Sequence, residues 1–245
     1  LEALASEQAR ATQTFRWPTQ DLAACRDLAT TIWSQVQEAA EVWYDRSSRC
    51  ELTTFIGYEY SGATELANYH RNVIFRGATV PPYPTSYMEA PTEVELWKAL
   101  RSECIDAGTG CDVLSIPHNS NWSNGQLYHV EYPGAENLEE EAEAARLRAE
   151  IEPLVEIYQH KGDSECSNGL TDVLGGEDEH CNFEKLIQAP FANCGEEPGS
   201  GMMIGLGCIS RRDFVRYVLT DGLKEADRLG ANPFKLGIIA STDTH

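Results

Sequence analysis

Side chains that could bind a metal ion follow several apolar segments of this sequence. The segment "GIIASTDTH" places Asp243 and His245 one residue apart directly after an apolar run, and Glu59 and His118 follow "TTFI" and "DVLSI". Carboxylates and imidazoles together suit divalent metals such as zinc, manganese or iron. A cluster of such ions could polarise a phosphoryl oxygen and lower the pKa of water, which is the chemistry of hydrolysis.

An Asp-x-His pair alone carries little information, so the elements that position these residues decide the interpretation. Helical periodicity predicts helices over 27–43, 93–104, 136–150 and 211–229, and apolar runs predict strands over 51–61, 111–117, 153–159 and 232–242. Thr92 and Glu95 have capping-box spacing, and Ser210 could cap the last helix. Strands separated by helices indicate a parallel sheet, closed as a barrel or doubly wound, whose strand ends share one face.

Composition and charge exclude several classes of protein. The chain has 245 residues, 42% of them hydrophobic, and a formal net charge of -20. No apolar run approaches the ~20 residues of a membrane span. The negative charge repels phosphate backbones, so nucleic acid is not expected as a partner. We expect a small anionic ester as substrate, and the sequence leaves the oligomeric state open.

Cysteine usage indicates an oxidising compartment. The eight cysteines include no C-x-x-C pair, so disulfides are favoured over a zinc site. Cys104 with Cys111 and Cys166 with Cys181 are natural short-range pairs, although the sequence leaves the connectivity open. The Gly-rich segment 166–209 is expected to be an insertion held by disulfides. We expect a periplasmic or secreted protein whose signal peptide is not in this chain; the alternative is a cytosolic enzyme with free thiols.

Several segments together resemble a known superfamily. "FIGYEYS", "HRNVIFRG", "LSIPHNSNWSNGQ", "EPLVEIYQHKGDSEC" and "NPFKLGIIASTDTH" are similar to a bacterial family of unknown function within the PHP (polymerase and histidinol phosphatase) metallohydrolases. The resemblance implies an α/β fold, a distorted (β/α)7-type barrel that holds two or three divalent ions and hydrolyses phosphate esters. By position it implies five metal ligands, namely Glu59, His70, His118, Asp243 and His245. It also implies catalytic roles for Glu59 and His118.

Four further residues are candidates for binding substrate, and two of them, Arg71 and Lys161, have an alternative interpretation. Arg71 could hold a phosphate oxygen or pair with a carboxylate. Asn119 is a neutral donor in the loop after His118, and Lys161 and Glu165 follow the strand over 153–159. Lys161 could equally be structural, and His70 could be a core histidine.

The resemblance also implies that the barrel is incomplete. Members of the superfamily begin with strands ending in His-x-His and Asp-His, whereas the first histidine here is His70. We therefore expect residues 1–245 to be one partial metallohydrolase domain, an internal fragment that is inactive alone. The alternative function is a disulfide-stabilised extracellular binding module without catalysis, which metal content would distinguish.

Overall fold

The sheet of this protein is antiparallel where the candidate ligands lie. The computed structural model describes residues 22–171, 176–178 and 180–244. Strands β1 (Ile56–Gly62), β2 (Tyr69–Phe75) and β3 (Val113–Pro117) form an antiparallel sheet in the order β1-β2-β3. Strand β4 (Leu154–Glu156) pairs in parallel with β7 (Gly237–Ile239), and a parallel bridge between His118 and Glu156 connects β3 to β4. Strands β5 (Tyr158–Gln159) and β6 (Gly162–Asp163) form a separate hairpin.

The expected (β/α)7-type barrel is wrong. Among the described residues the strands form small sheets with no closed barrel, and the β4–β7 pair is the only parallel one apart from the single His118–Glu156 bridge. The reason lies between β1 and β2, where residues 63–68 contain only the short 3-10 turn η1 (Thr64–Leu66). A connection this short joins antiparallel strands, because a parallel pair needs a crossover of a dozen or more residues.

Helices occupy the positions that the sequence pattern predicts. They are α2 (Leu22–Trp43), α3 (Glu93–Glu103), α4 (Leu138–Ile151) and α5 (Val215–Leu229). Thr92 and Glu95 form the expected capping box at the start of α3. Ser210 caps the short turn η5 (Arg211–Asp213) instead of α5, which begins only at Val215. None of the described helices is long and apolar enough to cross a membrane.

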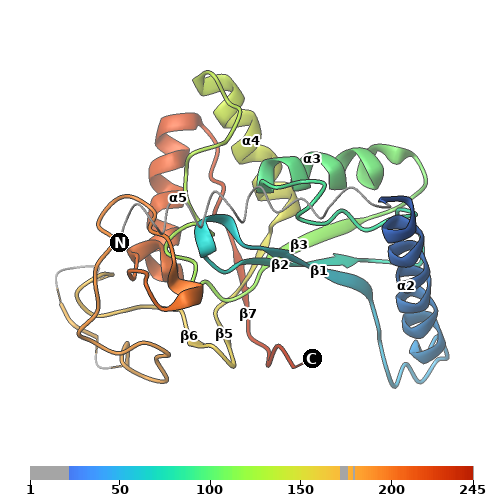
Figure 1. Ribbon diagram of the computed structural model, residues 1–245, viewed down its shortest axis with the longest axis horizontal. Helices are drawn as coiled ribbons and strands as arrows, with labels where there is room; N and C mark the ends of the chain where they lie inside the picture. Colours follow the sequence, from blue (N-terminus) through green and yellow to red (C-terminus); the bar gives the residue numbers. More distant parts are fainter. Residues whose placement is uncertain (1–21, 172–175, 179, 245) are drawn as a thin grey trace.

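The helices α3 and α4 lie over one face of the sheet, the covered face (Figure 1), and the opposite face is termed the open face. On the covered face, Tyr60 donates a hydrogen bond to the carbonyl of Ala90, and Trp97 donates one to Glu152 at the end of α4. Trp97 and Tyr60 are fully buried. Burying large side chains of this kind is the main favourable term in folding, so this face is the core of the molecule.

Disulfides close the connection from α3 to β3 and two loops after β6. The pairs are Cys104–Cys111, Cys166–Cys181 and Cys194–Cys208, and Cys50 is an exposed free thiol. The side chain of Cys25 lies outside the described residues. The two predicted short-range pairs are therefore confirmed, and three disulfides fit an extracellular or otherwise oxidising environment.

Two further 3-10 turns complete the described structure. They are η2 (Ile105–Ala107), which follows α3, and η4 (Met202–Ile204), inside the loop closed by Cys194–Cys208. This loop packs against the turn between β1 and β2, where Gly201 N–H donates to the carbonyl of Glu65 over 2.9 Å. The insertion is thus attached to the strands that carry the candidate ligands.

Candidate metal centre

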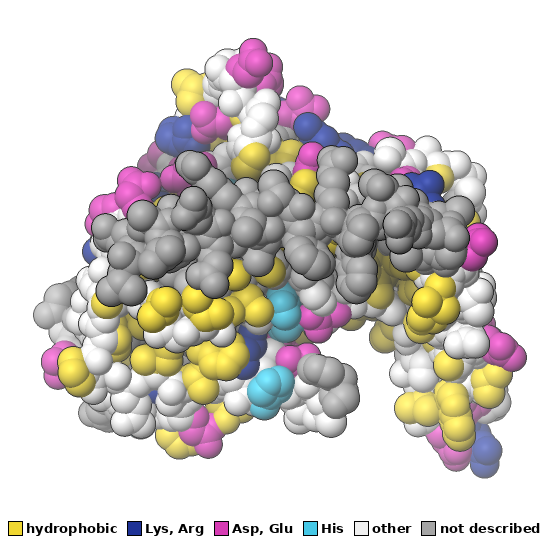
Figure 2. All heavy atoms as spheres, in the orientation of Figure 1, with side chains coloured by type: hydrophobic (Ala, Val, Ile, Leu, Met, Phe, Trp, Pro, Cys, Tyr) yellow, Lys and Arg dark blue, Asp and Glu magenta, His cyan; other side chains and the backbone are white. Residues whose placement is uncertain are grey.

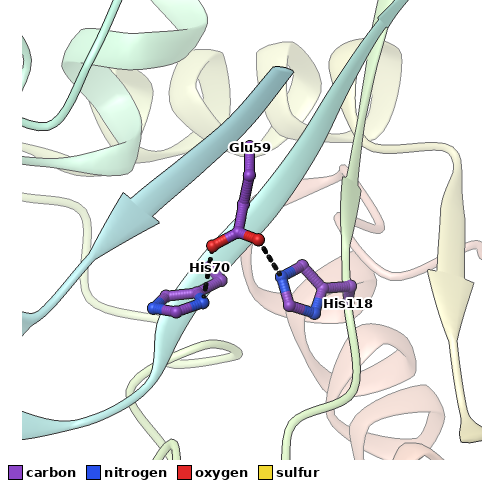
Figure 3. A group of neighbouring side chains, drawn as sticks. All are labelled: Glu59, His70 and His118. Atoms are coloured by element: carbon purple, nitrogen blue, oxygen red, sulfur yellow. Dashed lines mark ion pairs between the residues drawn. The ribbon is translucent and has the colours of Figure 1, made fainter. Parts of the chain in front are cut away.

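Strand register brings Glu59, His70 and His118 onto the open face of the sheet. His70 pairs with Ser61, so Glu59, two residues before Ser61, shares its face and lies diagonally across from it. Arg71 pairs with Pro117, and continuing the register by one residue sets His70 beside His118. Side chains alternate between faces along a strand, so all three point away from α3 and α4 (Figure 3). Glu59 thus lies inside β1, not beyond its end as expected.

The three side chains offer a compact set of ligand atoms. His70 Nδ1 lies 2.8 Å from Glu59 Oε1, and His118 Nε2 lies 3.8 Å from Glu59 Oε2. One carboxylate oxygen and one nitrogen from each ring all lie within 4.8 Å of one another. The His118 Nε2 atom is buried and has no hydrogen-bond partner within the described structure. A divalent cation at this position would take that nitrogen, one nitrogen of His70 and one carboxylate oxygen of Glu59 as ligands, so the residues fit a metal ion.

Electrostatics keep Glu59 and His118 in the protonation states that a metal requires. A hydrogen bond from His70, together with one from Ser61, lowers the pKa of Glu59 to about 2 against the opposing effect of burial. Burial, reinforced by the charge of Lys161, lowers the pKa of His118 to about 4. At neutral pH the carboxylate of Glu59 is therefore ionised and the imidazole of His118 is neutral, as metal ligands must be.

Asp243 lies next to this group, whereas His245 lies outside the described residues. The amide nitrogen Nε2 of Gln159 donates to Asp243 Oδ2 over 2.8 Å and lies 3.1 Å from His118 Nδ1. Asp243 is also largely buried, with 14% of its side chain exposed. One buried side chain thus connects two of the predicted ligands, which come from segments more than a hundred residues apart.

The predicted substrate-binding residues occupy different environments. Arg71 points to the covered face, where its guanidinium is fully buried and its Nε lies 2.5 Å from Glu152 Oε1. The Asn119 amide donates to the carbonyl of Gly162 over 2.6 Å, which fixes the loop to the β5–β6 hairpin. In these positions both polar groups hold the fold together.

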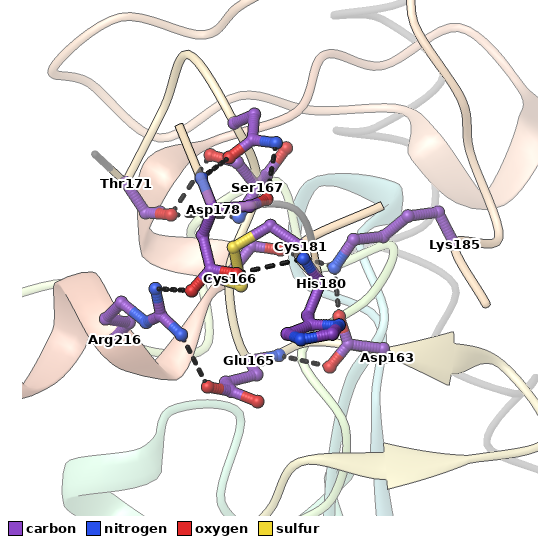
Figure 4. Close-up of a disulfide and its surroundings, with 11 residues drawn as sticks. Asp163, Glu165, Cys166, Ser167, Thr171, Asp178, His180, Cys181, Lys185 and Arg216 are labelled. Atoms are coloured by element: carbon purple, nitrogen blue, oxygen red, sulfur yellow. Dashed lines mark hydrogen bonds and ion pairs between the residues drawn. A yellow bond between two sulfur atoms is a disulfide. The ribbon is translucent and has the colours of Figure 1, made fainter. Parts of the chain in front are cut away.

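Glu165 lies beside the Cys166–Cys181 disulfide. Arg216 of α5 contacts Glu165 over 2.7 Å and Asp178 over 3.0 Å, so it links both sides of the disulfide loop (Figure 4). Lys185 pairs with Asp163 in the same region. The carboxylate of Glu165 is therefore engaged in a surface ion pair.

Two residues near the centre were not among the predicted site residues. Gln159 is 1% exposed and contacts both His118 and Asp243. Glu156 is 2% exposed, accepts a hydrogen bond from Ser241, and shares the face of His118 through their parallel bridge. Burial, and after it the charge of Asp243, raises the pKa of Glu156. The only sequence signal was their place at the end of the apolar run 153–159.

A cavity of about 580 Å³ adjoins the centre, and Gln159, Lys161 and Ser241 are among its lining residues. Its size is within the range of small-molecule sites, roughly 300–1,000 Å³. Figure 2 shows histidine, acidic and basic side chains exposed close to one another near the middle of this side of the molecule, with hydrophobic side chains beside them. The cavity is linked to the metal-capable group through Gln159, which lines the cavity and contacts His118.

Comparison with known proteins establishes the family. A family model described as "Protein of unknown function (DUF3604)" matches residues 2–245. The chain belongs to the DUF3604 family. The expected membership of the PHP superfamily is wrong, because the match is to DUF3604 and not to a PHP family. No curated protein and no solved structure matches this DUF3604 chain at a significant level.

Proposed function

We propose that this DUF3604 chain is a metal-dependent hydrolase that cleaves a small ester, with a phosphate ester as the favoured substrate. The observation that carries the proposal is the group formed by Glu59, His70 and His118, whose ligand atoms lie within 4.8 Å of one another. Two imidazoles and one carboxylate are a common ligand set for catalytic zinc and for iron(II), and such sites keep a coordination position open.

A bound divalent ion would supply Lewis acidity and would lower the pKa of water near the ester. The protein's own residues prepare the site for that chemistry. Glu59 stays ionised and orients His70 through their 2.8 Å contact. Gln159 holds Asp243 close to His118, so that Asp243 could help to bind a second ion. We propose two or three ions in the complete site, with zinc, manganese or iron as candidates.

The disulfides bear on where the enzyme works. Three disulfides in one chain favour a compartment outside the reducing cytosol. We propose a periplasmic or secreted location, where the enzyme would meet esters from outside the cell.

Metal reconstitution and an ester screen test this proposal. The protein, produced at its full natural length, is stripped with chelator, reloaded with Zn²⁺, Mn²⁺ or Fe²⁺, and assayed with aryl phosphate monoesters and diesters and with an aryl acetate. Hydrolysis should require added metal and should be lost in Glu59→Gln, whereas Glu51→Gln, which changes an exposed carboxylate, should behave as wild type.

The alternative of a binding module without catalysis predicts a different result from the same experiment. A disulfide-stabilised module would bind no more than one structural ion and would hydrolyse none of these esters at any metal loading. Metal binding without turnover across the whole screen would therefore contradict the hydrolase and favour the module.

A further inference from the structure

Lys161 is a buried cation held next to the candidate metal centre. Only 5% of the residue is exposed. Its ammonium Nζ donates to Asn68 Oδ1 over 2.9 Å and to the carbonyl of Asn119 over 3.2 Å. Asn68 lies two residues before His70, and Asn119 directly follows His118. The ammonium therefore lies between the two segments that supply the histidines.

The charge of Lys161 has no direct counterion in the described part of the chain, where no carboxylate oxygen lies within 4.0 Å of Nζ. The carboxylates of Asp243, Glu156 and Glu59 act on it from farther away. An ammonium has three N–H donors, and two of them are used. Among the described residues, Lys161 thus retains one donor and a charge that is not directly paired.

Neighbouring cations differ from Lys161 in this respect. Arg71 pairs with Glu152 on the covered face, and Lys185 pairs with Asp163. Burying a cation without a direct counterion is costly, and a neutral donor could make the same two hydrogen bonds. A fixed positive charge at this point is therefore better explained by an anion that arrives from solution.

We propose that Lys161 binds an oxygen of a tetrahedral oxyanion group in the substrate, so that the substrate class is phosphate or sulfate esters. This inference rests on the proposed function. Lys161 is among the residues that line the cavity beside the centre. In a chain with a net charge of -20, an anionic substrate needs a local cation of this kind in addition to any metal.

Binding of manganese and of inorganic phosphate, measured separately, tests the inference. Calorimetry first gives the affinity of the protein for Mn²⁺ alone, and then that of the Mn²⁺-loaded protein for phosphate and for sulfate. The variants are Lys161→Met, which keeps the length of the side chain, and Lys161→Gln, which keeps a donor. Lys235→Met removes the same charge from an exposed position and serves as the control.

We expect both Lys161 variants to bind phosphate at least about tenfold more weakly, since a charge-assisted hydrogen bond is lost. Their affinity for Mn²⁺ should stay equal or increase, because a nearby positive charge is gone, and Lys235→Met should match wild type. If wild type binds sulfate more tightly than phosphate and the Lys161 variants do not, the favoured substrate within this class is a sulfate ester.

Two results would overturn the inference, and a third would overturn the proposed function instead. Wild-type affinity for phosphate in a folded Lys161 variant means that Lys161 is structural. If Mn²⁺-loaded wild type binds neither phosphate nor sulfate, Lys161 is likewise structural. This second result does not depend on whether the variants fold. Absence of Mn²⁺ binding to wild type contradicts the metal centre itself.

Discussion

Removing the Cys194–Cys208 disulfide should weaken both the fold and metal binding, because its loop braces the segments that carry the histidines. Asn124, in the loop after His118, donates to the carbonyl of Cys208 over 2.7 Å and accepts from Met202 N–H over 3.1 Å. The same loop reaches the β1–β2 turn through the hydrogen bond from Gly201. Metal ligands that lose supporting contacts of this kind typically lose about 10–100-fold in affinity.

The size of the stability loss follows from loop closure. The two cysteines are 14 residues apart, and a closed loop of about 15 residues stabilises the folded state by about 3 kcal/mol in the chain-entropy model. For a chain of this size, about 3 kcal/mol lowers Tm by roughly 6–12 °C. Replacing both cysteines with serine should show this shift by calorimetry, together with an approximately tenfold loss of Mn²⁺ affinity.

The Cys166–Cys181 disulfide provides a matched control. Its cysteines are 15 residues apart, so the entropic loss is almost the same. Its loop differs in its contacts, because Asp178 within the loop pairs with Arg216 of α5. Replacing this pair should lower Tm by a similar amount. Mn²⁺ affinity should stay within about twofold of wild type, because substitutions at sites that do not touch usually act independently to about that accuracy. Equal losses of metal affinity in both variants, or none in either, would refute the bracing role of the first loop.

Further predictions concern charge, pH and thiols. Glu59→Gln should weaken Mn²⁺ binding by about 100-fold or more. A ligand carboxylate lies closer than about 4 Å to the divalent ion and so contributes at least about 8 kcal/mol at an effective dielectric constant of about 20, of which dehydration offsets the larger part. Unchanged affinity would exclude Glu59 as a ligand. Burial opposes both charges of the Glu93–His129 pair, but the imidazolium still lowers the pKa of Glu93 to about 2 and Glu93 raises that of His129. The contribution of Glu93 to the free energy of unfolding is present above pH 4.5 and is lost as pH falls toward 2. The contribution of His129 is present below pH 6.5 and is lost as pH rises through the pKa of His129 in the folded protein. His129→Gln should therefore flatten the fall of Tm above pH 6.5, and an unaltered profile would contradict this. Denatured, non-reduced protein should show at most two reactive thiols among its eight cysteines, and finding eight would exclude the disulfides.

Local elements of the fold could be predicted from the sequence because their signals are local. The capping box of Thr92 and Glu95 marks the start of α3, and the periodic apolar residues of 27–43 locate α2. Strand pairing was not predictable in the same way, because the alternation "IGYEYSG" gives the two faces of β1 but not its partner. The short connection between β1 and β2 was the one clue to an antiparallel sheet.

The candidate centre was predictable in part. Glu59, His118 and Asp243 were singled out by their residue types and their place near apolar runs. The fold brings Glu59 and His118 together and links Asp243 to His118 through Gln159. The opposite orientations of His70 and Arg71 follow from alternation along β2 and could have been inferred. The contact between Lys161 and Asn68 spans 93 residues and depends on tertiary packing, which no local pattern encodes.

Locating a bound metal ion tests the central claim most directly. Crystals of the protein soaked in Mn²⁺ or Zn²⁺ and measured at the absorption edge of that metal should give an anomalous peak about 2.0–2.2 Å from a Glu59 oxygen and from one nitrogen each of His70 and His118. The peak should be absent from crystals of Glu59→Gln. A peak at a different position, or no peak in wild-type crystals at metal concentrations that support binding in solution, would contradict the metal centre.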